Sequence, residues 1–336
     1  MKKVLILGAG MVSKPMFEYL LEKNISFTAA SNTPENSRKV IGNNPLGKSV
    51  FIDILKDKAL MEKLIAEHDL TVSLLPYAFH VEVAKLCIKH KKNMVTTSYV
   101  KPEMKALEED AKKAGIIILN ESGLDPGIDH MSAMRIIDRI HNKKGKVLEF
   151  YSFCGALVAP EVEKNPFNYK FTWAPKGVVM AGNNDGKYLR HGKVTYVSTE
   201  DLFKKPIRLD FPDVGKLEVY PNRDSLPYIE LYGIPETKTM FRGTFRYTKW
   251  CQILTAMKKL DLISYDKINL KNKTYAEFMA GQIKAKNSKN IKTKTAEYLK
   301  LTEGSNPVKA LEWLGLFSNE KTGRTEDSPF EIVSDL

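Results

Sequence analysis

The sequence VLILGAGMVS, which spans Val4–Ser13, decides the fold of the first part of the chain. Its first four residues are apolar, as is typical of a short buried strand. Two glycines follow with the spacing of the G-x-G-x-x-G pattern: the first permits a tight turn, and the second lets the backbone approach a pyrophosphate. Ser13 replaces the third glycine and is small enough for close packing of helix on strand. Because Met11–Glu22 is predicted to be helical, the motif opens a helix whose N-terminal N–H groups can bind an anion.

From this motif to Leu119, strand-like and helix-like segments alternate. The predicted strands are Val4–Leu7, Ser26–Ala30, Val50–Asp53, Thr71–Leu75, Met94–Thr97 and Ile116–Leu119. The predicted helices are Met11–Glu22, Pro34–Ile41, Lys58–Glu67, Ala78–His90 and Pro102–Ala114. Such alternation implies right-handed crossovers between parallel strands. We therefore predict the α/β class, with a Rossmann-type doubly wound parallel sheet in a nucleotide-binding domain of residues 1–127.

The pattern changes after residue 127. A helix is predicted at Ile128–Ile140 and a strand at Lys146–Phe153. The segment from Pro160 to Tyr247 is rich in aromatic residues, turn pairs and short strand-like runs, which favours an antiparallel sheet. The helices predicted after it are Trp250–Leu262, Tyr275–Lys286, Lys294–Thr302 and Val308–Phe317. We expect residues 128–336 to form a second, α+β domain with a mainly antiparallel sheet, used for substrate binding and dimerisation.

Length and charge bound the class of protein. The 336 residues suffice for about two domains. A net charge of +12 is compatible with a nucleic-acid partner, but only 9 of the 52 basic residues are arginine and the lysines are scattered. We therefore expect a lysine-rich solvated surface and no nucleic-acid partner. The positive field would attract an anionic cofactor and a polycarboxylate substrate.

The cysteines and the apolar runs predict the compartment. Cys87, Cys154 and Cys251 are odd in number and lack metal-ligand spacing, so neither a disulfide framework nor a metal is expected. No run approaches the ~18 apolar residues of a membrane helix, and the first apolar run breaks at Gly8, too early for a signal peptide. We expect a reduced, cytoplasmic protein without a membrane partner.

The sequence NESGLDPGIDH, at Asn120–His130, follows the last predicted strand. Ligands of open α/β sheets bind outside the carboxyl ends of the strands. This loop carries Asp125, Asp129 and His130 among turn-forming residues, so we expect chemistry here. Asp129 and His130 lie at a predicted helix start, where capping is the simpler role.

The end of the second predicted strand favours NADP over NAD. An NAD site places an acid about twenty residues beyond the glycines, to bind the ribose hydroxyls. Here Ser31, Asn32 and Thr33 occupy that place, so no carboxylate repels a 2′-phosphate. Arg38 and Lys39 follow about one helical turn later. Asp53, after the third strand, either faces the adenine side or caps the next helix.

The fourth and fifth strands end at the same edge. Pro76 and Tyr77 either line the cofactor or form a strand-to-helix turn, and His80 is expected to be a surface residue at a helix start. Ser98 and Tyr99 either donate hydrogen bonds to a substrate carboxylate or cap the next helix.

The few arginines are concentrated in the second domain. Strand alternation places Arg242, Thr244 and Arg246 on one face, and Arg223 lies in a turn. The guanidinium fork matches a carboxylate, so we favour anion binding over surface salt bridges. Cys154, alone in a predicted strand, is by itself more typical of a small core residue.

Taken together, these segments resemble the saccharopine reductase family, the NADP-dependent, L-glutamate-forming saccharopine dehydrogenases of lysine metabolism. The resemblance covers nearly the whole chain. It rests on Ser73–His80, Thr97–Tyr99, Asn120–His130, Ser152–Gly155, Asn165-Pro166 with Tyr169-Lys170-Phe171 and Trp173, Tyr220–Ser225 and Arg242–Tyr247.

The resemblance implies residue roles as well as a reaction. The NADP site would comprise Gly8, Ala9, Gly10, Met11, Val12, Ser31, Asn32, Thr33, Asp53, Ile54, Leu75, Pro76, Tyr77 and Leu124. The substrate site would comprise Ser98, Tyr99, Asp125, Arg223, Thr244, Phe245 and Arg246. The residues nearest the reacting nitrogen would be Tyr99, Asp125 and Cys154.

In the implied reaction, 2-aminoadipate semialdehyde condenses with L-glutamate, and NADPH reduces the imine to saccharopine in lysine biosynthesis. Saccharopine carries three carboxylates, which suits the arginines, and Asp125 would stabilise the protonated imine with Tyr99 as a relay. The alternatives are a related imine reductase, such as carboxynorspermidine dehydrogenase, and a non-catalytic nucleotide-binding protein.

Two features depart from the family. Asn32 stands where the family usually has Arg, and the family's second domain runs further than Leu336. We therefore expect a C-terminally incomplete second domain, in which the apolar face of Val308–Phe317 needs a partner, and a homodimer is expected.

Overall fold

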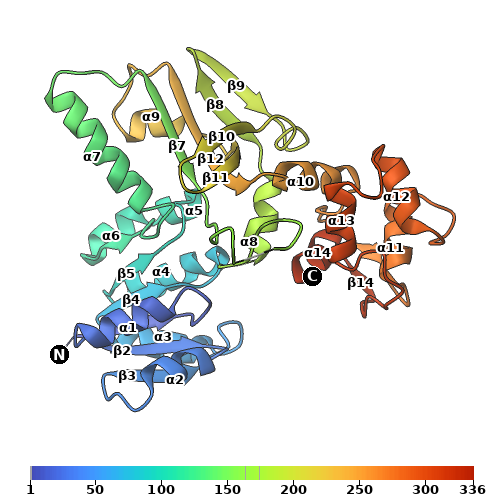
Figure 1. The fold of residues 1–336 in the computed structure, drawn as a ribbon. Coiled ribbons are helices and arrows are strands. Elements are labelled where there is room, and N and C mark those ends of the chain that lie inside the picture. The colour runs from blue at the N-terminus through green and yellow to red at the C-terminus, as the bar shows by residue number, and fades with distance from the viewer. Residues whose placement is uncertain (1, 163, 174) are drawn as a thin grey trace. The chain divides into compact units, whose positions relative to one another are not determined.

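The computed structural model describes residues 2–162, 164–173 and 175–336. The chain forms two compact units, Met1–Ile136 and Ile137–Leu336 (Figure 1). The division falls inside helix α7 (Ile128–Asn142), later than the boundary at residue 127 that the loss of strand–helix alternation suggested. In the described part of the chain, no helix is both long and apolar enough to cross a bilayer.

The first unit is built on a six-stranded parallel sheet, as predicted, and the structure gives its strand order as β3-β2-β1-β4-β5-β6. Its strands are β1 (Lys3–Leu7), β2 (Ser26–Ser31), β3 (Gly47–Phe51), β4 (Leu70–Ser73), β5 (Asn93–Thr96) and β6 (Ile118–Leu119). The order reverses between β1 and β4, which is where a doubly wound sheet binds a dinucleotide.

Helices cover both faces of this sheet because successive side chains of its strands point to opposite faces and are buried on both. The helices are α1 (Lys14–Glu22), α2 (Glu35–Ile41), α3 (Lys58–Glu67), the short η1 (Tyr77–Phe79), α4 (His80–Lys89), α5 (Pro102–Lys105) and α6 (Glu108–Ala114). Leu5 and Leu7 pack in one core with α3 and α4. Ile6 packs in the other, where the rings of Phe17 and Phe27 stack at 5.5 Å.

Two predicted helices of this unit were wrong in extent. Helix α1 begins at Lys14 rather than Met11, because the N–H of Ser13 bonds back to the Gly10 carbonyl at 3.2 Å and closes the preceding turn. The predicted helix Pro102–Ala114 is two helices. They separate because the N–H of Leu107 bonds to the carbonyl of Met104, three residues back, which tightens the turn.

The second unit contains a mainly antiparallel sheet, as predicted. Its strands are β7 (Glu149–Cys154), β8 (Gly186–Arg190), β9 (Lys193–Val197), β10 (Ile207–Phe211), β11 (Gly215–Pro221) and β12 (Thr239–Tyr247). The order is β10-β11-β12-β8-β9, and β7 adds to β12 in parallel. The nine residues of β12 therefore form the centre of the sheet.

The helices of this unit lie between the strands of the sheet and after them along the chain (Figure 1). They are α8 (Pro175–Met180), η2 (Ala181–Asn183), α9 (Pro227–Leu231), α10 (Trp250–Lys259), α11 (Tyr275–Gln282), α12 (Ile291–Leu299), α13 (Asn306–Trp313) and α14 (Pro329–Asp335). Helix α14 and the pair β13 (Ile268–Asn269) and β14 (Glu326–Asp327) were not predicted, because a short apolar cluster in a polar tail shows no full helical period.

Helix α13 finds its partner inside this unit. Leu311 and Leu316 are fully buried, and α13 packs against α10. The expectation that this apolar segment lacks a partner was therefore wrong for these side chains, because helices distant in sequence converge on it. Trp313 does remain 54% exposed.

Candidate functional site

The glycine motif forms a tight loop between β1 and α1. Gly8 has a φ of 107°, and a Cβ there would lie 3.1 Å from the carbonyl oxygen of Leu74, the residue after β4, so glycine is required. A Cβ on Gly10 would meet no heavy atom within 4 Å, which leaves the space above the loop open. Ser13 is buried, and its hydroxyl donates to the Gly10 carbonyl at 2.7 Å. The loop is therefore held rigid with space for a pyrophosphate.

The end of β2 offers hydrogen-bonding groups and no carboxylate. The Ser31 hydroxyl oxygen accepts from the Thr33 N–H at 3.1 Å and lies 3.2 Å from the Thr33 hydroxyl. Asn32 is exposed beside them. Arg38, on α2, is exposed and pairs with Glu35 at 3.6 Å. This edge can therefore accept a 2′-phosphate without repulsion.

Large apolar side chains remain exposed around the same carboxyl edge. They are Met11 and Val12 after β1, Phe51 and Leu55 at and after β3, Tyr77 after β4, and Leu124 after β6, each between 47% and 68% exposed. Single exposed apolar residues are ordinary, but these lie at the ends of four strands of one sheet, β1, β3, β4 and β6. They fit a cofactor with flat rings at both ends, so the residues present suit NADP.

Asp53 lies in a turn two residues beyond β3. Its carboxylate accepts from the Leu55 N–H at 3.0 Å and lies 3.4 Å from Lys56 Nζ. Tyr77 lies in η1, with Lys101 Nζ 3.5 Å from its ring centre. Both residues thus have local structural roles, and neither role excludes contact with a cofactor.

Tyr99 and Asp125 meet at the carboxyl ends of β5 and β6. The Tyr99 hydroxyl donates to Asp125 Oδ1 at 2.6 Å, within the range of charge-assisted O–H···O⁻ bonds. Both residues are only partly buried. Twenty-six residues apart in sequence, they are brought together because β5 and β6 are neighbouring strands.

The loop that carries Asp125 is tied down along its length. The N–H of Glu121 bonds to the Ser98 carbonyl at 3.2 Å, and that of Ser122 bonds to the Thr96 carbonyl at 3.1 Å. Within the loop, the Gly123 N–H bonds to the Pro126 carbonyl at 2.9 Å. The loop therefore keeps a fixed position against the end of β5.

The neighbours of Asp125 have structural partners. Asp129 Oδ1 accepts from the Gly127 N–H at 2.7 Å, which is a capping contact at the start of α7. His130 Nε2 lies 2.9 Å from Glu121 Oε2. The Asp129 contact supports the capping role suggested by its place at a helix start, whereas His130 contacts a side chain of the preceding loop.

The expectation of a surface position for His80 was wrong. It begins α4 but is only 3% exposed. Its ring nitrogens lie within 3.0 Å of the hydroxyl oxygens of Ser73, Thr96 and Ser98. Sequence position alone did not reveal this, although hydroxyl residues at the ends of the fourth and fifth strands were a usable signal.

The arginines of β12 lie on one face, as strand alternation predicted, and they are buried. Arg242 is 4% exposed with its guanidinium 4.2 Å from the Tyr228 ring centre, and Arg246 is 3% exposed. Thr244, between them, hydrogen bonds to Tyr220 on β11. A surface salt-bridge role is therefore excluded for both arginines.

Arg246 lies among buried polar atoms that lack partners. Its guanidinium is 4.9 Å from the ring centre of Tyr169 and 5.0 Å from that of Trp250. In the described part of the chain, Arg246 Nε, the Tyr169 hydroxyl and Trp250 Nε1 are all buried without a hydrogen-bond partner. Glu218 lies opposite Arg246 in the strand pairing, and its carboxylate accepts from the Cys251 N–H at 3.1 Å and lies 3.8 Å from Arg208 Nε. Buried donors are normally satisfied, so this cluster has the chemistry to receive an anionic group.

The remaining predicted residues of the second unit are more accessible. Arg223 is exposed and adopts a φ of 57°, and its carbonyl accepts from the Lys187 N–H at 2.9 Å. Phe245 is half-buried and packs against Phe153 at 5.3 Å. Cys154 ends β7 and is half-buried. In contrast, burial raises the pKa of the Cys87 thiol to about 11, which makes that cysteine unreactive.

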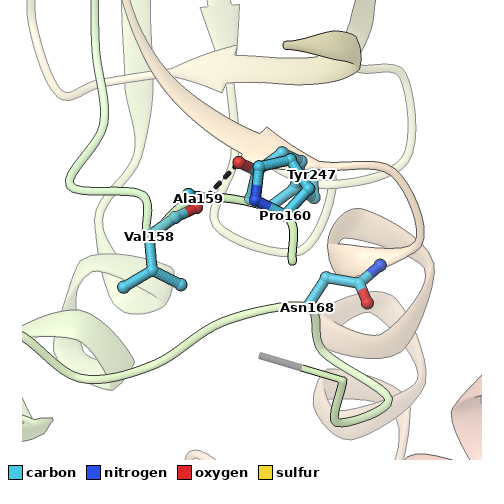
Figure 2. Close-up of a pocket in the computed structure, with 5 residues that line it drawn as sticks. All are labelled: Val158, Ala159, Pro160, Asn168 and Tyr247. Atoms are coloured by element: carbon cyan, nitrogen blue, oxygen red, sulfur yellow. Dashed lines mark hydrogen bonds between the residues drawn. The ribbon is translucent and has the colours of Figure 1, made fainter. Parts of the chain in front are cut away.

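A small cavity lies beside the end of β12 (Figure 2). It has a volume of about 130 Å³ and is lined by Val158, Ala159, Pro160, Asn168 and Tyr247. The Tyr247 hydroxyl donates to the Val158 carbonyl at 2.8 Å. Ligand pockets usually measure about 300–1,000 Å³, so this cavity is too small for a tricarboxylate.

Two family models match the chain. Residues 4–119 match the saccharopine dehydrogenase NADP binding domain. Residues 123–336 match the saccharopine dehydrogenase C-terminal domain.

Individual relatives match over most of the chain. Saccharopine dehydrogenase [NADP(+), L-glutamate-forming] of Pyricularia oryzae is 37% identical over 95% of this chain and 72% of its own length. The enzyme of the same name from Schizosaccharomyces pombe is 39% identical over 95% of this chain and 73% of its own. The apo structure of the L-Glu-forming saccharopine dehydrogenase from Saccharomyces cerevisiae has a TM-score of 0.83 at 35% identity, covering 99% of this chain and 77% of that one. The chain therefore belongs to the saccharopine dehydrogenase family.

Proposed function

We propose that this protein reduces, with NADPH, the imine formed from 2-aminoadipate semialdehyde and L-glutamate, giving saccharopine reversibly. The observation that carries this function is the hydrogen bond of 2.6 Å from Tyr99 to Asp125. It joins a proton-handling pair to the sheet edge that also holds the open glycine loop, in a chain of the saccharopine dehydrogenase family.

NADP would be held by residues of that edge. The loop of Gly8, Ala9, Gly10, Met11 and Val12 would receive the pyrophosphate at the start of α1. Other contacts would come from Ser31, Asn32, Thr33, Asp53, Ile54, Leu75, Pro76, Tyr77 and Leu124. When bound, the reduced cofactor supplies a hydride, so that the imine carbon gains a C–H bond and NADP⁺ remains.

Asp125 and Tyr99 would manage charge and protons at the reacting nitrogen. An imine accepts hydride readily once its nitrogen is protonated, and the Asp125 carboxylate stabilises that cation. Tyr99 both donates to Asp125 and carries a proton that it can exchange with solvent. The nitrogen keeps the proton that it gained as an iminium and takes the former C=N π electrons as its lone pair, so the product is a secondary amine. We expect Cys154 near the same nitrogen.

The three carboxylates of saccharopine would be held by cationic and hydroxyl groups. We assign these contacts to Ser98, Tyr99, Arg223, Thr244 and Arg246. Phe245 and Asp125 belong to the proposed substrate site without holding a carboxylate. The unpartnered donors around Arg246 support this assignment, because a carboxylate would satisfy them with charge-assisted bonds.

One assay tests the function. NADPH oxidation should require both 2-aminoadipate semialdehyde and L-glutamate, and neither alone should support turnover. Turnover with the imine precursor of carboxynorspermidine instead would assign the protein to that related reaction. Binding of NADPH, seen by fluorescence, without turnover on either substrate would show a nucleotide-binding protein.

We also propose a homodimer formed through one face of the second sheet. The aromatic rings of Tyr151, Phe153, Phe245 and Phe211 form a continuous row with neighbouring centres 5.3–6.0 Å apart. Tyr151 is 46% and Phe211 44% exposed. Aromatic residues are enriched at interfaces, so a second copy could cover this row.

Two further proposals concern the cell. We propose a cytoplasmic protein, because none of the three cysteines forms a disulfide and two are buried. Cell fractionation tests this proposal.

We also propose that the reaction runs toward saccharopine in lysine biosynthesis. A deletion strain that requires lysine would support that direction.

A further inference from the structure

His80 connects two strand ends behind the candidate active site. Its Nδ1 lies 3.0 Å from the Ser73 hydroxyl at the end of β4. Its Nε2 lies 2.8 Å from the Ser98 hydroxyl and 3.0 Å from the Thr96 hydroxyl, both from β5 and its loop. All four residues belong to the first unit.

Ser98 is linked in turn to the residues proposed for chemistry. It precedes Tyr99, which donates to Asp125, and its carbonyl accepts from the N–H of Glu121 in the loop that carries Asp125. Ser98 itself is half-buried, whereas His80 is fully enclosed. His80 is therefore buried behind Ser98 and reaches the proposed substrate site only through the Ser98 hydroxyl.

The imidazole is neutral in this position. Burial lowers the pKa of His80 from 6.5 to about 4. A neutral imidazole has one N–H donor and one nitrogen acceptor. Whether Nδ1 carries the proton therefore determines whether Nε2 is an acceptor or a donor.

The two tautomers have opposite effects on Ser98. If Nδ1 carries the proton, Nε2 is an acceptor with one lone pair, and it takes the hydrogen of the Ser98 or Thr96 hydroxyl. If Nε2 carries the proton, it donates toward both oxygens while Nδ1 accepts from Ser73. The Ser98 hydrogen is then available to point away from His80, toward a ligand oxygen.

We propose that His80 is a positioning residue, present as the Nε2–H tautomer with Ser73 donating to Nδ1, that leaves the Ser98 hydroxyl free to donate to a substrate carboxylate. This inference rests on the proposed function, because it needs a carboxylate substrate. A substrate that offered a hydroxyl group instead of a carboxylate could donate as well as accept, so it would not need Ser98 to act as a donor.

The tautomer can be measured directly. Two-bond ¹H–¹⁵N spectra of the whole protein distinguish protonated from unprotonated ring nitrogens. We expect Nε2 of His80 to be protonated and Nδ1 not. A protonated Nδ1 would overturn the proposal. The spectra do not require the protein to turn over a substrate.

Kinetics provide the second measurement. His80→Phe and Ser98→Ala should each raise the KM for saccharopine about 10- to 100-fold, the effect of losing a hydrogen bond to a charged group, while NADP⁺ affinity stays unchanged. His80→Gln places an amide N–H near Nε2 and should restore the KM to within a few-fold of wild type. The His80→Phe, Ser98→Ala double variant should be no worse than Ser98→Ala alone. Additive losses would overturn the proposal.

His68 provides a matched control. It is also buried in the first unit at 5% exposure, with Nδ1 2.6 Å from the Leu64 carbonyl and Nε2 2.8 Å from the Thr28 hydroxyl. It precedes β4, at the amino edge of the sheet, whereas His80 follows it. His68→Phe should lower the melting temperature without changing the KM. Wild-type protein that turns over no saccharopine would refute the proposed function and leave the tautomer measurement intact.

Discussion

Replacing Tyr99 with Phe tests the proposed proton-handling pair most directly. The Tyr99–Asp125 contact of 2.6 Å is a short bond to a carboxylate. Hydrogen bonds to charged groups contribute about 1.5–3 kcal/mol, and about 1.4 kcal/mol corresponds to tenfold in rate. Tyr99→Phe removes the donor and keeps the ring. We therefore expect kcat/KM for saccharopine oxidation to fall roughly 10- to 100-fold.

The partner variant Asp125→Asn keeps size and hydrogen bonding but removes the charge that stabilises an iminium. Proton-transfer groups contribute about 10²–10⁴-fold, and we expect a loss of that size in turnover with NADPH binding retained. The control is Tyr196→Phe, which removes a hydrogen bond of 2.5 Å from an exposed tyrosine to Asp185. That variant should keep full activity.

The double variant decides whether the two groups act as a unit. Because Tyr99 acts through the Asp125 carboxylate, the Tyr99→Phe, Asp125→Asn protein should be about as slow as Asp125→Asn alone. Independent sites add within about 0.3–0.5 kcal/mol. Additive losses in kcat/KM, or an Asn variant with full activity, would refute the reasoning and make Asp129 and His130 the next candidates.

Four other outcomes follow from the same residues. Asn32→Asp should move cofactor preference from NADP toward NAD by repelling the 2′-phosphate, and tighter binding of NADH than NADPH by wild type would contradict the cofactor assignment. Arg223→Ala and Arg246→Lys should each weaken saccharopine binding about 10- to 100-fold, measured by calorimetry, whereas Arg190→Ala, which removes an exposed side chain at the end of β8, should not. Unchanged affinity in the first two variants would give these arginines structural roles only. The folded state resists protonation of His80, whose pKa falls from 6.5 to about 4, so its contribution to stability is complete above about pH 6.5 and is lost as the pH falls toward 4. The melting-temperature difference between wild type and His80→Gln should therefore shift against wild type over that interval, and a constant difference would show that His80 does not titrate there. Phe211→Asp should convert the dimer to monomer in sedimentation experiments, and an unchanged dimer would exclude the aromatic row.

Local sequence patterns determined the architecture of both units. The alternation of short apolar runs with helical segments predicted the six parallel strands and the glycine loop after β1, because side-chain periodicity and backbone freedom at glycine are properties of a few neighbouring residues. The same period of two placed Arg242, Thr244 and Arg246 on one face of β12.

Other features depended on segments that lie far apart in the chain. The burial of His80 requires hydroxyl groups from β4, β5 and the loop that follows, and the partners of α13 come from other helices. The unsatisfied atoms around Arg246 come from Tyr169, Trp250 and β12 itself. A local pattern specifies which face a side chain takes, but its burial and its hydrogen-bond partners are decided by the strands and helices that pack there, and only the tertiary structure brings those together.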